Sequence, residues 1–432
     1  MLDISINLKS AGSGLSHELY TTNDEIVGEV VIIATDDIHV DDLDISFIGD
    51  TQTRFDNFGA APVTPNISYT AKRFLHLQQP FEKPPCGMIL KAAHPHSFPF
   101  NFIIPDRLLP SSCPCLHSDE HLLPPPTMGG AHRWHDHHHS HQTLDDPTPV
   151  MAQVAYTITA KVLYNKPGGT HGRRSVQLAD FSRPVCVVPD FPESPPIFLQ
   201  QPSRSRDAPA SEYRLRQEKP ISNGLFSRGR AGCLVVEVPQ QPSALKGGLR
   251  TKGSPASTTL LLRFDPASDD DSCGPPPQLE DVKRKIQATT VFRAGQMEAD
   301  PAYGGLVSAR PQQQQQQGRQ QRSYTEAVAL PSLCVSGARW VRCGASWAHE
   351  RLFEEAGGDG RGLETMVAPS SAYRGGPYYL LKLVIPVEYP SGKALVPSFR
   401  SCLVDRMYRL DVTVTLGSFS SVAVRVPIQL CT

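Results

Sequence analysis

The chain has 432 residues, enough for two or three domains, but only 39% of them are hydrophobic, which is low for a compact globular protein. The 40 Pro and 32 Gly indicate that globular domains are diluted by disordered segments. With 42 Lys and Arg against 43 Asp and Glu, the net charge of -1 provides no overall field that would draw the chain onto nucleic acid or an acidic membrane.

The N-terminus alternates apolar and polar residues from Met1 to Lys9, and it lacks the basic flank and the apolar run of a signal peptide. No apolar run elsewhere in the sequence is long enough to span a membrane. The ten Cys show no spacing typical of a disulfide framework. We therefore expect a cytoplasmic protein without a transmembrane segment, peripheral at most at the plasma membrane or endosomes.

Apolar residues recur at every second position over much of the chain. Such alternation places the apolar side chains on one face of a strand and predicts antiparallel sheets with one buried face. Many short strands and few helices predict an all-β protein built from two tandem immunoglobulin-like β-sandwich domains with long disordered loop insertions. The stripes run through residues 43–47, 98–104, 154–162, 381–387, 412–416 and 422–430.

Residues 279–288 fit two interpretations. Leu279, Val282 and Ile286 have helical spacing, but the segment can equally be an extended strand that continues into the apolar residues after it. Residues 351–356 have the composition of a single helical turn within a loop.

Segments rich in Pro, Gly, Ser or Gln interrupt the strand pattern, because they cannot bury enough apolar surface to offset the entropy of ordering them. We predict a first sandwich over residues 1–192 with a His- and Pro-rich insertion at 113–149, a linker at 193–228, and a second sandwich over 229–432. Disordered insertions in the second sandwich are predicted at 240–257, 266–277, 294–323 and 344–376.

A His-rich run is the candidate metal site, because neutral imidazoles bind zinc, copper or nickel. It lies in a Pro- and Gly-rich insertion rather than on the ordered scaffold typical of a structural zinc site. We therefore interpret the run as a flexible polar loop and predict no cofactor. The candidate ligands are His132, His135, His137 and His139, to which Cys113, Cys115, His117 and His121 upstream could add.

Sequence signatures of enzymes are absent. The chain has no phosphate-binding loop, no Gly-x-Ser-x-Gly elbow and no His-Glu-x-x-His pair. We therefore predict a protein that is not an enzyme and has no catalytic residues. The alternative of another class is a metal-dependent enzyme built around the His-rich run.

Several segments match known strand motifs in order along the chain. Residues 20–30 have a turn followed by a strand like Val-x-Gly-x-Val, and 40–53 have an aliphatic stripe that leads into Gly-x-x-x-Thr. Residues 96–105 contain Phe-Pro-Phe-x-Phe-x-Ile-Pro, and 156–162 contain Tyr-x-Ile-x-Ala. In this order the segments resemble the N-terminal domain of the arrestin family.

The C-terminal half is similar to an arrestin C-terminal domain over residues 383–386, 395–410 and 426–430. The inserted low-complexity loops resemble those of fungal arrestin-related proteins, the alpha-arrestins. The motif residues are Asp24, Gly28, Gly49, Phe98, Pro99, Phe100, Phe102, Pro105, Tyr156, Pro397, Phe399 and Tyr408.

These motif residues have structural interpretations. Gly28 and Gly49 lie inside strand patterns, where Gly marks a bulge or a close approach of another group. The three Phe form a one-faced stripe that we expect in the core, and the two Pro bracket a strand at an edge or an end. We expect Tyr156 and Tyr408 in the core with their hydroxyls at the rim of a sheet.

The resemblance implies a non-enzymatic adaptor that binds cytoplasmic tails of membrane transporters or receptors and links them to ubiquitin ligases and endocytic trafficking. The sequence departs from the family pattern in two ways. It has no Pro-Pro-x-Tyr motif for direct recruitment of a ubiquitin ligase, and the strand at 183–189 has no clear counterpart of the phosphate-sensing Arg of visual arrestins. The alternative within the family is an arrestin-type component of ambient pH signalling bound to a membrane sensor.

Overall fold

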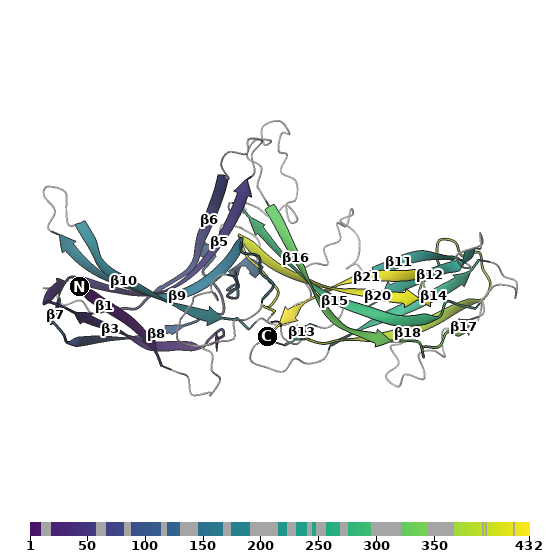
Figure 1. The fold of residues 1–432 in the computed structure, drawn as a ribbon, viewed down its shortest axis with the longest axis horizontal. Helices are drawn as coiled ribbons and strands as arrows, with labels where there is room; N and C mark the ends of the chain where they lie inside the picture. Colours follow the sequence, from purple (N-terminus) through teal and green to yellow (C-terminus); the bar gives the residue numbers. More distant parts are fainter. Residues whose placement is uncertain are drawn as a thin grey trace.

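The computed structural model is built from β-strands, and its described residues include two short 3-10 helices and no α-helix (Figure 1). The described residues are 1–9, 19–57, 66–81, 88–113, 119–129, 146–166, 174–190, 215–222, 230–239, 244–247, 256–267, 275–294, 321–343, 367–390, 393, 395–417 and 420–432.

The elements of the N-terminal half form two main sheets and one small one. A three-stranded sheet has the order β1-β3-β8, a five-stranded sheet has the order β2-β10-β9-β5-β6, and β4 pairs with β7. The elements are β1 (Leu2–Leu8), β2 (Leu19–Tyr20), β3 (Glu25–Ala34), β4 (Ile38–Val40), β5 (Asp42–Asn57), β6 (Asn66–Gln78), β7 (Met88–Leu90), β8 (Pro95–Ile103), η1 (Pro110–Ser112), η2 (Asp119–Leu122), β9 (Ala152–Lys166) and β10 (Arg174–Val187).

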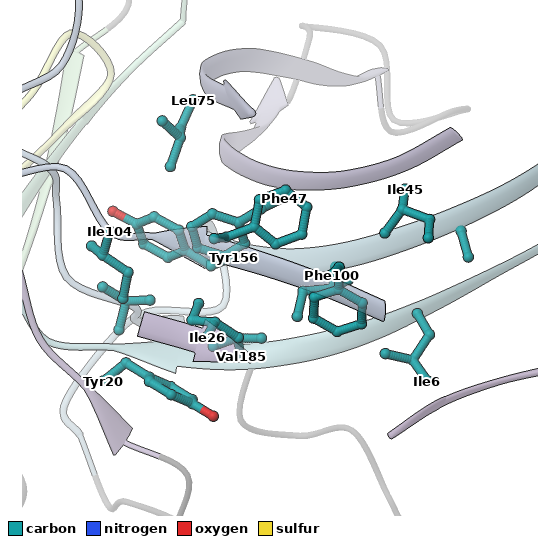
Figure 2. Close-up of a cluster of buried hydrophobic side chains, with 14 of the residues drawn as sticks. Ile6, Tyr20, Ile26, Ile45, Phe47, Leu75, Phe100, Ile104, Tyr156 and Val185 are labelled. Atoms are coloured by element: carbon teal, nitrogen blue, oxygen red, sulfur yellow. The ribbon is translucent and has the colours of Figure 1, made fainter. Parts of the chain in front are cut away.

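The core of this first sandwich lies between its two main sheets. Phe47 on β5 contacts Phe102 on β8, with ring centroids 5.9 Å apart, and stacks on Tyr156 of β9 at 5.8 Å. Figure 2 shows Phe47, Phe100 and Ile26 among the aliphatic side chains that fill the space around them. Each strand contributes alternate residues to this cluster, as the period-two stripes predict.

The C-terminal half repeats the architecture. A five-stranded sheet has the order β11-β12-β14-β18-β17, a second has β16-β15-β20-β19 with β21 also paired to β20, and β13 pairs with β22. The strands are β11 (Leu215–Ser222), β12 (Arg230–Val238), β13 (Leu245–Lys246), β14 (Ala256–Pro266), β15 (Leu279–Arg293), β16 (Gln321–Cys334), β17 (Val341–Cys343), β18 (Tyr378–Val387), β19 (Phe399–Arg400), β20 (Val404–Leu416), β21 (Ser420–Ile428) and β22 (Leu430–Cys431).

The segment that fitted either a helix or a strand is strand β15. It pairs with both β16 and β20, and Ile286 stands opposite Val328 on one side and Leu410 on the other. Ile286 and Leu410 belong to the second buried cluster, which fills this sandwich. Long-range pairing on both edges therefore outweighs the local helical spacing.

Gly28 and Gly49 both lie where another group comes close. A Cβ at Gly28 would stand 2.4 Å from the carbonyl oxygen of Asn7 and 2.5 Å from the ring of Phe100. At Gly49 it would stand 2.4 Å from the ring of Phe74, beside a bulge in the pairing of β5 and β6. Both glycines make room for a neighbour, which is the structural interpretation given above.

The predicted linker at 193–228 is wrong over residues 215–222, because these form β11 at the edge of the second sandwich, paired with β12. Five of the eight residues of β11 are Arg, Gln, Glu, Lys or Ser, so composition alone indicates a linker. Polar residues are tolerated there because an edge strand with an exposed face buries few side chains.

The predicted insertions likewise include ordered residues. Within 113–149, residues 119–122 form η2, and Met128 is fully buried and bridges to Val154. Strands β13 and β16 and residues 367–376 fall partly or wholly inside other predicted insertions. Pro-rich composition thus identifies the connecting segments, but it does not predict where the ordered residues within them begin and end. The segment considered as a helical turn, 351–356, lies outside the described residues.

Candidate functional site

The two sandwiches meet through apolar side chains. Phe55 on β5 contacts Phe292 on β15, with ring centroids 5.3 Å apart, and the guanidinium of Arg322 on β16 lies 5.5 Å from the Phe55 ring. The Thr53 hydroxyl donates to the carbonyl of Arg293 at 2.8 Å. Residues of both sandwiches belong to one buried cluster. The halves therefore dock as a single packed unit along this junction (Figure 1).

A buried guanidinium lies at the centre of the junction. Arg406 on β20 is 0% exposed, and its Nη2 donates to the Asp146 carboxylate at 2.6 Å. Its Nη1 donates to the Pro147 carbonyl at 3.0 Å and to the Thr290 hydroxyl, and its Nε donates to the Tyr408 hydroxyl at 3.1 Å. Because Asp146 precedes the N-terminal strand β9 and Arg406 belongs to the second sandwich, this ion pair joins the two halves.

Burial sets the electrostatics of this cluster. Burial raises the pKa of Asp146, and the adjacent guanidinium of Arg406 opposes that rise. Burial alone would lower the pKa of Arg406, but Tyr408 and Asp146 raise it overall. Burial raises the pKa of Tyr408 to about 12, so this side chain is a neutral hydrogen-bonding partner at physiological pH. Arg406 therefore stays charged and needs all of its acceptors, since a buried charge without partners is costly.

Further polar contacts flank the central cluster. Arg400 on β19 pairs with Glu120 of η2 at 3.2 Å. The hydroxyl of Thr432 donates to the Asp190 carboxylate at 3.0 Å, next to the end of β10. These contacts join elements far apart in the sequence and add polar pairs to the junction.

Two long edge strands, β6 and β16, lie beside the junction. β6 ends one five-stranded sheet and β16 ends the sheet of the second half that contains β15, and no described strand pairs with the outer side of either. Figure 1 shows the β5–β6 and β15–β16 hairpins side by side on one face of the molecule. Tyr69 on β6 is 70% exposed and Tyr324 on β16 is 37% exposed. Unpaired backbone groups beside exposed aromatic rings are suited to binding an extended peptide.

The sequence-derived motif residues have structural positions in the first sandwich. The three Phe of β8 are buried and belong to the core. Pro99 is exposed on β8, which is an edge strand, and Pro105 follows the end of that strand. The Asp24 carboxylate accepts the Thr21 backbone N–H at 2.8 Å and so closes the turn before β3.

The motif residues of the second sandwich lie at the junction. Pro397 and Phe399 are buried, and Phe399 belongs to the cluster that the two halves share. Tyr156 and Tyr408 are both buried, and their hydroxyls donate to carbonyls outside the strands. The Tyr156 hydroxyl donates to the Pro125 carbonyl at 2.7 Å, and that of Tyr408 donates to the Val396 carbonyl at 2.6 Å.

The His-rich run, with its candidate ligands His132, His135, His137 and His139, lies outside the described residues, as do Cys115 and His117. Among the residues that the structure describes, one group of three side chains could hold a metal ion, namely Cys113, His121 and Cys402. No helix in the described part of the chain has the length and apolar character needed to cross a membrane.

Sequence reasoning missed Arg406 and Asp146 as junction residues. A signal for Arg406 was present, because it occupies the same phase of the stripe as Tyr408 and Leu410, which point inward. A charged residue in a buried phase needs partners. Asp146 gave no such signal, because it lies in an irregular segment beside the His-rich run.

Residues 12–162 match the family model described as arrestin (or S-antigen), N-terminal domain. This match covers most of the first sandwich, from before β2 into β9. No curated protein matches the chain. Arrestins are in general not enzymes but adaptors or scaffolds. Residues 12–162 are thus an arrestin N-terminal domain, and with the second β-sandwich that follows them the fold is arrestin-like.

Proposed function

We propose that this chain is a non-enzymatic, protein-binding adaptor that recognises cytoplasmic tails of membrane transporters or receptors. The main support is that β6 and β16 are both edge strands without a described partner strand on their outer side, beside a junction that fixes the two sandwiches to each other. An extended tail segment would add to one of these edges by backbone hydrogen bonds, and its side chains would contact Tyr69 or Tyr324.

The rigid junction supports this proposal. An adaptor that reads a tail with strands from two domains gains affinity when those strands are held in place beforehand, because less entropy is lost on binding. The Phe55–Phe292 contact holds β5 against β15, the inner partners of the two edge strands, and the buried Arg406–Asp146 pair joins β20 to the segment before β9.

We further propose that the bound cargo is passed to ubiquitination and endocytic machinery in the cytoplasm or at the plasma membrane and endosomes. The sequence contains no Pro-Pro-x-Tyr motif, so recruitment of a ligase would be indirect or would use another segment. We also propose that residues 193–214 connect the two sandwiches. The motif residues described above then serve the fold and not the binding of cargo.

Proximity labelling with the full chain in cells tests the class of partner. We expect membrane transporters or receptors together with trafficking components among the labelled proteins. A single dominant membrane sensor, with no effect on general transporter uptake, would instead favour the role in ambient pH signalling. Recovery of neither membrane proteins nor trafficking components would refute the adaptor proposal.

Binding of synthetic tail peptides from the labelled proteins tests the site. Exposed tyrosines in interfaces often contribute much of the binding energy, so Tyr69→Asp or Tyr324→Asp should weaken binding by about tenfold or more. Ile89→Asp is the matched control, because Ile89 is also an exposed apolar residue but lies on β7. Equal loss in the control and the two tyrosine variants would refute the edge-strand site.

A further inference from the structure

Three metal-ligating side chains meet at the junction. The Cys113 Sγ lies 3.3 Å from the Cys402 Sγ and 3.7 Å from the His121 Nδ1, and all three ligand atoms lie within 4.8 Å of one another. The two sulfurs are too far apart for a disulfide bond, which measures about 2.05 Å. Ideal tetrahedral zinc, with Zn–S of about 2.3 Å and Zn–N of about 2.0–2.1 Å, separates two sulfurs by about 3.8 Å and sulfur from nitrogen by about 3.5 Å. The Cys113–His121 separation is close to the ideal value, and the two sulfurs would move apart by about 0.5 Å to hold the ion.

A different backbone element positions each of the three side chains. Cys113 directly follows η1, and its N–H donates to the Pro110 carbonyl at 3.2 Å. His121 lies within η2. Cys402 lies in the tight turn between β19 and β20, which the Ser401 hydroxyl closes by donating to the Val404 carbonyl at 2.6 Å. Two ligands thus come from the first sandwich and one from the second, all on ordered backbone.

Two of the three candidate ligands are buried, and Cys113 is half-buried. His121 is 3% exposed and Cys402 is 6% exposed. The Lys72 ammonium donates a hydrogen bond to the Cys402 Sγ at 3.0 Å. Lys72, His121 and Cys402 line a small cavity of about 20 Å³ between the halves, which has room for one small ion or water molecule.

We propose that Cys113, His121 and Cys402 bind one Zn²⁺ ion that clamps the two sandwiches together. Binding releases the two thiol protons to solvent, so two thiolates and one neutral imidazole balance the charge of the dication. Three protein ligands leave the fourth tetrahedral position for water. The zinc site goes beyond the adaptor function and does not depend on it.

Zinc retention by the full chain tests the site. Purified protein is kept reduced, loaded with Zn²⁺, dialysed against metal-free buffer and analysed for zinc by mass spectrometry. We expect one zinc per chain, lost in Cys402→Ser and in His121→Ala but kept in His121→Cys, which supplies a thiolate in place of the imidazole. All variants are made in a chain whose His-rich run cannot contribute, because Ala replaces His132, His135, His137, His138, His139 and His141.

Cys233→Ser is the matched control, because Cys233 on β12 is 7% exposed, close to Cys402, but takes no part in the cluster. It should retain zinc. Circular dichroism of every variant checks that the β-structure is intact, and His121→Cys keeps the test decisive where Cys402→Ser does not fold. Replacement of zinc by Co²⁺ should give a thiolate-to-cobalt charge-transfer band that weakens in Cys113→Ser.

A chelator should lower the melting temperature of the wild-type chain but leave that of Cys402→Ser unchanged, because only a bound ion stabilises the folded state. The proposal is refuted by a wild-type chain that retains no zinc, or by a Cys402→Ser chain that retains as much as the control. Isolation of a Cys113–Cys402 disulfide from protein kept under reductant would also refute it and would identify the pair as a redox crosslink.

Discussion

Replacement of Arg406 by Met should strongly destabilise the folded chain. Met replaces the apolar stem of Arg as far as about Nε but has no hydrogen-bond donor, so Arg406→Met leaves Asp146 as a buried carboxylate and the Tyr408 hydroxyl and Thr290 hydroxyl without their common partner. Breaking a buried ion pair by removing one partner costs about 3–5 kcal/mol. We expect a loss in that range in the free energy of unfolding.

Urea unfolding at neutral pH, followed by tryptophan fluorescence and circular dichroism, measures this loss. If the two halves unfold together, the fluorescence and circular dichroism transitions coincide, and the slope of unfolding free energy against urea concentration is the same in the variant as in the wild type. Arg73→Met is the matched control, because Arg73 pairs with Asp50 at 3.0 Å on the exposed surface, where such a pair contributes at most about 1 kcal/mol.

The double variant Arg406→Met, Asp146→Leu completes the cycle. Removal of both charges leaves no buried charge unpaired. The double variant should therefore lose about 1–3 kcal/mol less stability than the sum of the losses in Arg406→Met and Asp146→Leu. The reasoning is refuted if Arg406→Met costs no more than the surface control, or if the two losses are simply additive.

Three other changes have outcomes that follow from the contacts. Phe292→Ala removes one of the two rings in contact at the junction and should cost about 3–5 kcal/mol in urea unfolding, whereas a loss below about 1 kcal/mol would contradict the packing. Gly28→Ala places a methyl group 2.4 Å from a carbonyl oxygen and should cost about 1–3 kcal/mol in the same assay; an unchanged midpoint would contradict the close approach. Cys334 is exposed and its hydrogen bond with Ser336 lowers its pKa, whereas burial raises the pKa of Cys186 to about 12, so iodoacetamide should modify Cys334 before Cys186. Peptide mass spectrometry over time checks this order, and earlier modification of Cys186 would contradict it.

The all-β fold could be predicted because its cause is local. Apolar side chains at alternate positions, such as Leu410, Val412 and Val414, line one face of a strand whatever its partner is. The junction could not be predicted, because its contacts join residues such as Asp146 and Arg406 that are 260 positions apart. A period-two pattern states which face is buried, but it does not state against which other sheet that face packs.

The candidate zinc ligands could not be grouped from the sequence for the same reason, because they meet through a long-range contact. Proximity in sequence assigns Cys113 and His121 to the nearby His-rich run as additional ligands. Cys402 was considered only as part of a strand motif. The structure brings it to the other two across the junction, a contact that no spacing rule contains.

The prolines of β8 affect how the molecule behaves at high concentration. An exposed strand edge can pair with the same edge of another molecule and start aggregation. Pro95 and Pro99 have no backbone N–H, so β8 offers two gaps in its row of donors. Self-assembly through this edge is therefore disfavoured, whereas β6 and β16 remain available for pairing with an extended peptide. The chain can therefore resist aggregation through β8 while its other edge strands remain free to bind peptides of partner proteins.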